Sequence, residues 1–397
     1  MKNFIIIGMS AAGIAAAARL RILDKDASIT CVSQEKEFPY NKCFLAEYLS
    51  GLKDLSGLNI RQETFFKDNN IQLIFNTKIT KINKKDKCIV AHDGTAFYYD
   101  KLLYATGGSI KSLPLEGIKS EGVFEFYTLQ DTEKILRYAK KETTKQVVII
   151  GAGLSGLECA DAILGYVKNI TIVDLQEHVL FRLLPQESAH FVQDKMKKYG
   201  VTFIPQITVK NIIQKHGIID SVVLSDGKIM KADMLVCALG AFPNSKLACD
   251  AGLKIENNLV VTNEYLQTSD PDIFAAGDVI QTFDTHTRVK LKSCTWPDAL
   301  VQGGCAAFNM AGTEKKYNGV TIIANSEFFR MKFYATGNFK KINLSYNQKL
   351  YQNKDCHRTI ISEAEIVKGF VLIGTIEHFS YLKRSLLLQQ PCDILIC

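Results

Sequence analysis

The features that this sequence lacks exclude several broad functions. None of its 11 cysteines belongs to a C-x-x-C pair, and no apolar run approaches the roughly 20 residues that a membrane-spanning helix needs. The net charge of +7, from 48 basic and 41 acidic residues, is too small for this length to indicate nucleic-acid binding. No Ser–His–Asp arrangement and no metal-ligand spacing is found either.

The chain does have the composition of an ordinary folded protein. It is 397 residues long, 47% hydrophobic and 22% charged, which predicts two or three domains at roughly 100–200 residues each. The cysteine count is odd, and most cysteines lie in apolar runs, as Cys159 and Cys237 do. This usage is typical of a reducing compartment, so we expect a soluble, cytoplasmic protein. Of the 11 cysteines, we expect only Cys43 to be placed for chemistry and the other ten to be packing residues.

The N-terminal stretch from Phe4 to Ala18 has an alternative interpretation as a secretory signal peptide. Two observations oppose it. Gly8 and Gly13 interrupt the stretch at the spacing of a phosphate-binding loop, and an arginine follows directly at position 19.

One unit occurs twice in the chain. An apolar run ending at Gly8 precedes a turn to Gly13, an alanine-rich helix and a second strand over residues 29–32. A run ending at Gly151 precedes a turn to Gly156, a helix over residues 157–164 and a strand over residues 170–173. Both units predict the strand, glycine-rich turn, helix and strand that open a dinucleotide-binding fold.

The chemistry of a dinucleotide explains these residue types. The first glycine makes the tight turn, the third allows close packing of helix and strand, and a small residue between them lets the pyrophosphate reach the helix N-terminus. Ser10 is that small residue in the first copy, and Gly153 in the second. An acidic residue should follow to accept the ribose hydroxyls, and Asp174 and Glu35 are the candidates. The carboxylate of Asp174 would repel a 2′-phosphate, which predicts NADH over NADPH.

Three further motifs lie in register along the chain. They are Ala105-Thr-Gly107, the G-A-x-P-N run from Gly240 to Asn244, and T-S-D-P-D-I-F-A-A-G-D from Thr268 to Asp278. With the glycine-rich turns, they resemble the FAD-dependent pyridine nucleotide–disulfide oxidoreductases. The likeness is greatest to the group of NADH oxidases, rubredoxin or ferredoxin reductases and nitrite reductase flavoproteins.

The resemblance implies FAD on the first unit and NADH on the second. Asp278 would bind the FAD ribityl chain, and the backbone near Ile79 would meet the adenine. The FAD residues expected with them are Gly8, Ser10, Ala11, Ala12, Gly13, Glu35, Asn41, Lys42, Thr106, Gly107, Gly277 and Trp296. Those expected for NADH are Gly151, Gly153, Leu154, Ser155, Gly156, Asp174 and Gly240.

We expect the segment from Phe38 to Gly51 to begin a helix beside the flavin. It resembles two branches of the family: the rubredoxin-reductase-like branch, with Lys42 and Cys43 in place of its arginine and first proline, and the NADH oxidase and CoA-disulfide reductase branch. In the NADH oxidase and CoA-disulfide reductase branch, Cys43 would be the redox cysteine, and a helix N-terminus with Lys42 would lower its thiol pKa. Phe44, in place of that branch's glycine, and Ala11, in place of its usual histidine, count against this role. The alternative is that Cys43 only packs beneath the flavin.

Two glutamates and the single tryptophan complete the candidates. Glu47 and Glu158 correspond to a lysine–carboxylate pair in the ferredoxin-reductase branch, so here two acids would face one another and one pKa would rise. An equally good alternative leaves Glu47 facing solvent. Trp296 would stack near the flavin or nicotinamide, or serve only as a core residue.

The resemblance implies an α/β protein with two Rossmann-like domains, the NAD domain inserted in the FAD domain, and a small C-terminal α/β domain. We expect FAD-binding segments at 1–112 and 243–319, an NAD-binding domain at 113–242 and an interface domain at 320–397. The implied function is an NADH-dependent FAD oxidoreductase that passes electrons to a small redox protein or another acceptor. The alternatives are a Cys43-based CoA-disulfide or persulfide reductase or NADH oxidase, and a flavoprotein whose bound NAD regulates partner binding.

A basic cluster of lysines at positions 81, 84, 85 and 87 is predicted to form a hairpin. It is either a solvated face or a dock for an acidic carrier of rubredoxin or ferredoxin type. The protein would be a monomer or a homodimer, without nucleic-acid or membrane partners.

Overall fold

The computed structural model describes residues 1–110, 113–337, 339 and 347–392. The chain divides into two compact units. The first comprises Met1–Leu45, Lys53–Ser109 and Ala241–Thr321, and the second comprises Ala46–Leu52, Ile110–Gly240 and Ile322–Cys397. Each unit contains a five-stranded parallel sheet, which agrees with the expected α/β class. The four-segment domain division stays a prediction.

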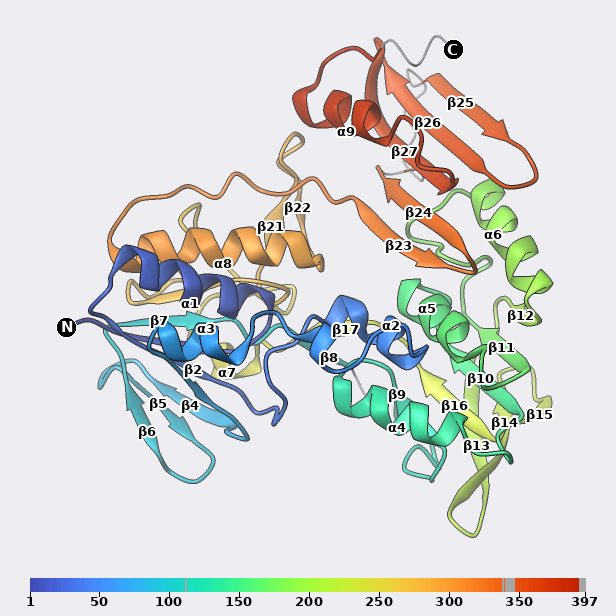
Figure 1. Ribbon diagram of the computed structural model, residues 1–397, viewed down its shortest axis with the longest axis horizontal. Coiled ribbons are helices and arrows are strands. Elements are labelled where there is room, and N and C mark those ends of the chain that lie inside the picture. The colour runs from blue at the N-terminus through green and yellow to red at the C-terminus, as the bar shows by residue number, and fades with distance from the viewer. Residues whose placement is uncertain (111–112, 338, 340–346, 393–397) are drawn as a thin grey trace. The chain divides into compact units, whose positions relative to one another are not determined.

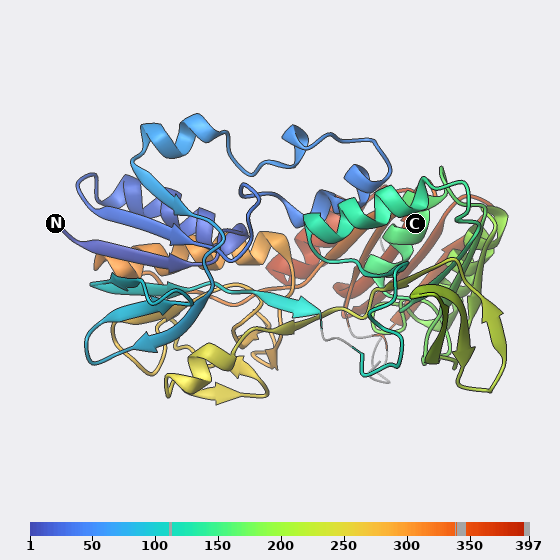
Figure 2. The same ribbon diagram turned by 90° about the horizontal axis from the view of Figure 1, so that it is seen from below.

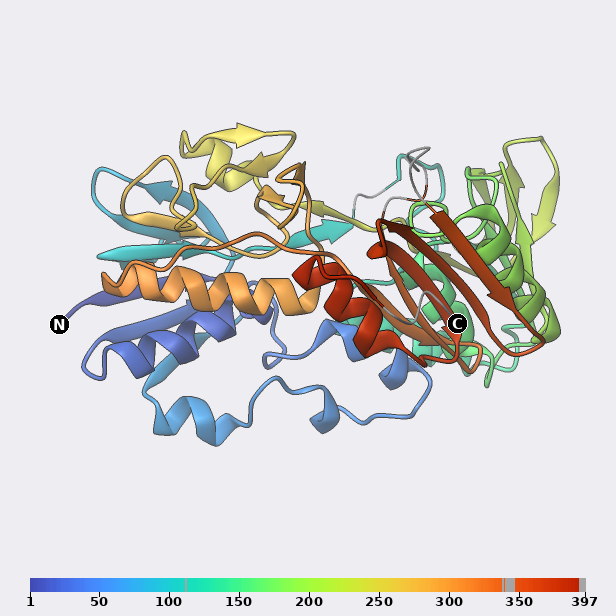
Figure 3. The same cartoon turned by 90° about the horizontal axis from the view of Figure 1, so that it is seen from above.

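The parallel sheet of the first unit has the strand order β20-β7-β1-β2-β3. Its strands are β1 (Asn3–Ile7), β2 (Ser28–Val32), β3 (Ile71–Ile74), β7 (Lys101–Tyr104) and β20 (Ile273–Ala275). The central strand β1 is apolar because both faces of a parallel sheet are covered. Helices α1 (Ala11–Leu23) and α8 (Trp296–Ala311) lie side by side on the sheet, with α1 against β1 and α8 against β7 and β20 (Figures 1 and 3).

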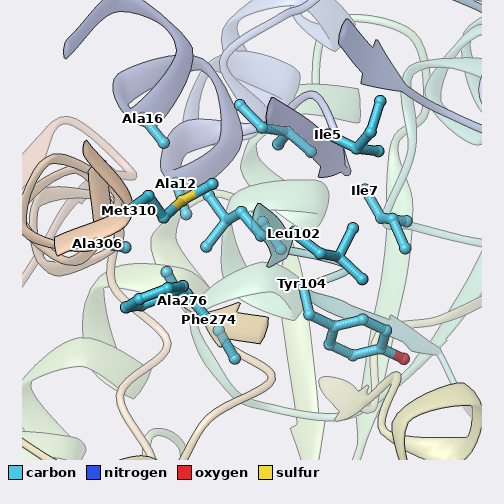
Figure 4. Packing of buried hydrophobic residues seen from close by; sticks show 14 of the residues in the cluster. Ile5, Ile7, Ala12, Ala16, Leu102, Tyr104, Phe274, Ala276, Ala306 and Met310 are labelled. Carbon is cyan, nitrogen blue, oxygen red and sulfur yellow. The ribbon is translucent and has the colours of Figure 1, made fainter. Parts of the chain in front are cut away.

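Small side chains bring α1 and α8 together. A Cβ on Gly303 would lie 2.1 Å from the carbonyl oxygen of Ala12, so only glycine permits this approach. Figure 4 shows Ala12 and Ala16 of α1 near Met310 and Ala306 of α8, with Leu102 and Phe274 beneath. The result is one continuous core under the first glycine-rich turn.

The remaining elements of the first unit are short. The lysine cluster forms the predicted hairpin between β4 (Ile79–Asn83) and β5 (Cys88–Ala91), and α7 (Lys246–Asp250) lies against β4 (Figure 2). The others are η1 (Lys42–Phe44), η2 (Ser56–Leu58), α3 (Glu63–Asp68), β6 (Ala96–Tyr98), β17 (Ala241–Pro243), β18 (Ile255–Glu256), β19 (Leu259–Val260), β21 (Thr282–Phe283) and β22 (Lys290–Leu291).

The second unit repeats the plan of the first. Its parallel sheet has the order β12-β11-β10-β16-β9, and an antiparallel sheet β13-β14-β15 follows. The strands are β9 (Val123–Glu125), β10 (Gln146–Ile150), β11 (Asn169–Val173), β12 (Val201–Ile204), β13 (Val209–Lys215), β14 (Ile218–Leu224), β15 (Ile229–Lys231) and β16 (Met234–Cys237). The helices are α2 (Leu45–Leu49), α4 (Leu129–Ala139), α5 (Leu154–Ile163) and α6 (Gln186–Lys198). Strand β8 (Gly108–Ile110), which lies mostly in the first unit, pairs with β17.

The C-terminal part of the second unit is an antiparallel sheet with one helix. The order is β23-β24-β27-β26-β25, and α9 (Phe379–Leu388) packs on β27 (Figure 3). The strands are β23 (Ala324–Phe328), β24 (Met331–Thr336), β25 (Asn347–Gln352), β26 (His357–Glu363) and β27 (Ile366–Gly374). The part of the chain expected to form a small C-terminal α/β domain thus contains both strands and a helix.

Candidate functional site

The first glycine-rich turn joins β1 to α1. Gly8 has a φ of +112°, and a Cβ there would lie 2.1 Å from the carbonyl oxygen of Ala105. A Cβ on Gly13 would lie 1.9 Å from the carbonyl oxygen of Gly8. Ser10 occupies the N-cap position of α1, but its side chain makes no capping hydrogen bond. The first-turn N–H groups, which include those of Ala11 and Ala12, are therefore not capped by that side chain, as a phosphate site requires.

The second turn, between β10 and α5, has the same geometry. A Cβ on Gly156 would again lie 1.9 Å from a carbonyl oxygen, that of Gly151, whose own φ is +110°. Gly153 is the N-cap residue of α5, and nothing lies within 4 Å of where its Cβ would be. Helix α5 begins at Leu154, three residues earlier than predicted, so Leu154 and Ser155 form its first turn. Open space beside Gly153 is what the close approach of a pyrophosphate to this turn would require.

An acidic residue accompanies each turn. Asp174 follows β11 directly, and its Oδ2 accepts a hydrogen bond from the N–H of Ala152 at 2.7 Å. Glu35 lies three residues beyond the end of β2 and accepts hydrogen bonds from the Tyr40 hydroxyl at 2.7 Å and the Lys42 ammonium at 3.1 Å. Both carboxylates are only partly buried, which leaves them accessible to ribose hydroxyls.

Asp278 lies at the start of the turn after β20, behind Gly277. Its carboxyl makes no hydrogen bond to the described residues, and burial raises its pKa to about 6, against the lowering effects of Lys292 and Lys42. A recessed carboxyl without a hydrogen-bond partner in the described part of the chain fits an acceptor for ligand hydroxyls, as a flavin ribityl chain would supply. The chemistry of this carboxyl therefore suits FAD in the first unit.

A buried network fixes the turn before Asp278. The Gln302 side chain accepts a hydrogen bond from the Gly277 N–H at 2.7 Å and donates to Asp298 at 2.7 Å. The Tyr317 hydroxyl donates to the other oxygen of Asp298, also at 2.7 Å. Desolvation raises the pKa of Asp298. Sequence spacing gave no role to Asp298 or Tyr317, because the network forms only when β20 and α8 meet.

The other expected FAD residues lie in the same unit. The Asn244 side-chain amide donates to the backbone carbonyl of Thr106 at 2.9 Å. The Thr106 hydroxyl donates in turn to the backbone carbonyl of Asn244 at 3.1 Å. Gly107 has a φ of +58° with open space at its Cβ position. Ile79 is buried at the start of β4, and Trp296 is partly buried against the core at the N-terminus of α8.

Gly240 has a φ of +77°, and it also has open space where a Cβ would lie. It ends a segment of the second unit.

The Cys43 segment differs from the expected helix. Cys43 lies within the three-residue 3₁₀ helix η1, is exposed, and donates its N–H to Asn41 at 2.9 Å. The five-residue helix α2 begins only at Leu45. The Lys42 ammonium is paired with Glu35, so part of its charge is already balanced.

Two other cysteines contradict the expectation that all except Cys43 are packing residues. Cys249 and Cys294 are exposed, because α7 is a short surface helix and position 294 lies in a loop.

Glu158 and Glu47 both belong to the second unit. Glu158 accepts a hydrogen bond from the Ser326 hydroxyl at 2.5 Å. Burial raises the pKa of Glu158, and the nearby Glu47 raises it further, against the effect of Ser326. Burial is thus the main cause of the raised pKa of Glu158, and the like charge of Glu47 is a smaller one. Glu47 is only partly exposed, and the catalytic roles of both glutamates stay predictions.

Within the described ranges, no cluster of histidine, cysteine and acidic residues could hold a metal ion. The same ranges contain no helix long and apolar enough to cross a membrane.

Two parallel sheets, each with a glycine-rich turn open at a helix N-terminus and an acid beside it, define a protein with two dinucleotide-binding folds. The chain belongs to the pyridine nucleotide-disulphide oxidoreductase family, whose model matches residues 2–303. It is therefore an enzyme, an NADH-dependent oxidoreductase of flavoprotein type, and FAD and NADH are the cofactors of the family chemistry.

Relatives with different acceptors match the chain. It is 33% identical to a protein named NADH oxidase from Methanocaldococcus jannaschii, over 84% of this chain and 75% of that one. It is 30% identical to a rubredoxin-NAD(+) reductase from Pseudomonas putida, over 78% of this chain and 80% of that one. The structure of an NAD-dependent persulfide reductase from A. fulgidus matches with a TM-score of 0.91 and 29% identity, over 98% of this chain and 77% of that one.

Proposed function

We propose that the first unit holds FAD and the second binds NADH, as an NAD-binding domain inserted in an FAD-binding domain. The observation that carries this proposal is the repeated turn, with a Cβ distance of 1.9 Å at both Gly13 and Gly156. When bound, the cofactors supply hydride transfer from the nicotinamide to the flavin.

The chain's own residues would bind and orient these cofactors. Backbone N–H groups at the starts of α1 and α5 would hold the two pyrophosphates. Asp278 would hold the ribityl hydroxyls, and Asp174 and Glu35 the riboses. Gln302 would keep Gly277, and with it Asp278, in place. Glu158 lies in α5, the helix that follows the second glycine-rich turn, and could hold a proton there because burial raises its pKa.

We propose a small redox protein of rubredoxin or ferredoxin type as the electron acceptor. The support is the relative named rubredoxin-NAD(+) reductase, which matches most of both chains. A second candidate, a Cys43-dependent disulfide or persulfide reductase, is favoured by the exposed thiol in η1 and by the likeness to the persulfide reductase.

An acceptor panel tests both candidates. Wild type, Cys43→Ser and the matched exposed-cysteine control Cys249→Ser are each assayed with NADH and a dye, rubredoxin, CoA disulfide and a persulfide. The carrier proposal predicts rapid rubredoxin reduction in all three proteins. If only disulfide or persulfide reduction is rapid, and Cys43→Ser alone abolishes it, the second candidate replaces the first.

A further inference from the structure

A cavity of about 1140 Å³ opens within the second unit, apart from the glycine-rich turn. Its walls come from the C-terminal end of α6, the β23–β24 turn, the β25–β26 hairpin and the segment after β27, with α6 beside β26 (Figure 1). It shares no residue with the 151–156 turn or with Asp174. Small-molecule pockets span roughly 300–1,000 Å³, so the cavity is large enough for a ligand of nucleotide size.

The charge lining this cavity is predominantly positive. The lining contains five lysine and arginine side chains, against two carboxylates, those of Asp355 and Glu377. The cations are Lys195, Arg330, Lys349, Lys354 and Arg358. An excess of three positive charges in one concave surface attracts a polyanion of small size.

Arg358 has a buried donor that lacks a hydrogen-bond partner among the described residues. Its Nε is buried without a hydrogen-bond partner in the described part of the chain, and its side chain is only 17% exposed. The nearest carboxylate, that of Glu377, lies 3.8 Å from the guanidinium and is itself 75% exposed. A buried guanidinium donor without a partner is costly. The Arg358 side chain also lines the cavity, and arginine pairs strongly with phosphate or carboxylate through its N–H donors.

The cavity also presents an aromatic surface beside the positive charge. The Tyr351 ring is 54% exposed, and the Arg358 guanidinium carbon lies 5.9 Å from its centroid. Tyr199 and Phe329, whose ring centroids are 5.8 Å apart, also line the cavity, but Phe329 is only 1% exposed, so Tyr351 is the ring open to a ligand. An exposed ring next to cations suits a planar base that carries phosphates, because the base stacks while the cations bind the phosphate oxygens.

We infer that this cavity binds a nucleoside di- or triphosphate, with the base on Tyr351 and the phosphates on Arg358 and its neighbouring lysines. The site stands independently of the proposed electron acceptor. It would give the enzyme a nucleotide-binding site separate from the one for NADH.

Equilibrium dialysis of the FAD-loaded protein in saturating NAD⁺ tests this site, with ATP and inorganic triphosphate as the probes. We expect ATP to bind, and to bind more tightly than triphosphate because the base adds stacking. The paired variant Lys349→Glu/Lys354→Glu should weaken ATP binding by about tenfold or more, since both phosphate-facing charges reverse. The control pair Lys168→Glu/Lys210→Glu makes the same charge change at exposed positions elsewhere in the unit and should leave affinity within about twofold.

Three results would overturn the inference: no ATP binding, equal binding of triphosphate and ATP, or equal losses in the two lysine pairs. Arg358→Met offers a second variant, expected to abolish ATP binding while the KM for NADH stays unchanged. If Arg358→Met does not fold, the lysine pair decides alone, because both of its members are exposed.

Discussion

Asp174 follows β11 directly, and its carboxylate accepts the N–H of Ala152 inside the second glycine-rich turn. This position would place a negative charge where NADPH carries its 2′-phosphate. At about 4 Å and an effective dielectric of 20, the repulsion reaches about 4 kcal/mol.

We therefore expect kcat/KM for NADH to exceed that for NADPH, and Asp174→Ala to narrow the ratio by on the order of tenfold or more. Steady-state kinetics with both cofactors measure this. Glu177→Ala, a change at an exposed acid three residues further along, is the control and should leave the ratio unchanged. Comparable kcat/KM values for both cofactors in wild type would contradict the role of Asp174.

We expect Asp278 to make FAD binding sensitive to pH. Its pKa is raised to about 6 by burial, and the ribityl hydroxyls would favour its ionised form. We expect FAD affinity to fall as pH drops below about 6, with a slope approaching tenfold per pH unit, and Asp278→Asn to remove that dependence. Flavin fluorescence titrations of the apoprotein measure the affinity; identical pH profiles in both proteins would exclude the role.

The same shift affects the apoprotein's stability. The folded-state pKa lies above the ordinary value of 3.8, so Asp278 favours folding most below that value. Its contribution is lost as pH rises through about 6.

At the scale of elements, a substitution in the β10–α5 turn can change cofactor binding without changing folding. A Cβ at Gly153 meets nothing within 4 Å, so Gly153→Ala should fold as wild type does. The added methyl would occupy the space proposed for the pyrophosphate, and we expect the KM for NADH to rise on the order of tenfold to a hundredfold.

Gly165→Ala is the matched control for Gly153→Ala, because its Cβ position is also open and lies in the same unit. Its kinetics should equal those of wild type. The visible flavin spectrum should be unchanged in both variants. A loss of bound FAD in Gly153→Ala, or an unchanged KM, would be inconsistent with NADH binding at this turn.

A buried histidine joins α6 to β26 within the second unit. His357 is fully buried, and its Nε2 lies 2.7 Å from the Ser188 hydroxyl, while its Nδ1 lies 3.0 Å from Gln352 Oε1. Desolvation lowers its pKa, partly opposed by Glu187. A base with a lowered folded-state pKa contributes stability that is complete above its ordinary pKa and is lost as pH falls from there toward the folded-state value.

We expect the melting temperature of wild type to fall from about pH 7.5 to about pH 5.5 more steeply than that of His357→Gln. His190→Gln is the control, because it removes an exposed histidine from the same helix. Thermal melts followed by circular dichroism test this, and parallel pH profiles for wild type and His357→Gln would refute it.

At the scale of the whole molecule, the sequence predicted local features better than long-range ones. The apolar runs ending at Gly8 and Gly151 were found because glycine spacing and β-branched residues are local signals. The network of Gln302, Asp298 and Tyr317 could not be found in this way, since it depends on how α8 packs on β20. The exposure of Cys249 and Cys294 was missed for a similar reason, because burial depends on the fold around a residue.

The most direct test of the account is rapid mixing of the FAD-loaded protein with NADH in the absence of oxygen. If the two units hold FAD and NADH as proposed, the flavin absorbance bleaches rapidly, with a rate that saturates with NADH and falls sharply at low NADH in Gly153→Ala. A flavin that stays oxidised, or bleaches too slowly to support turnover with any acceptor, would contradict electron transfer from NADH as the protein's function.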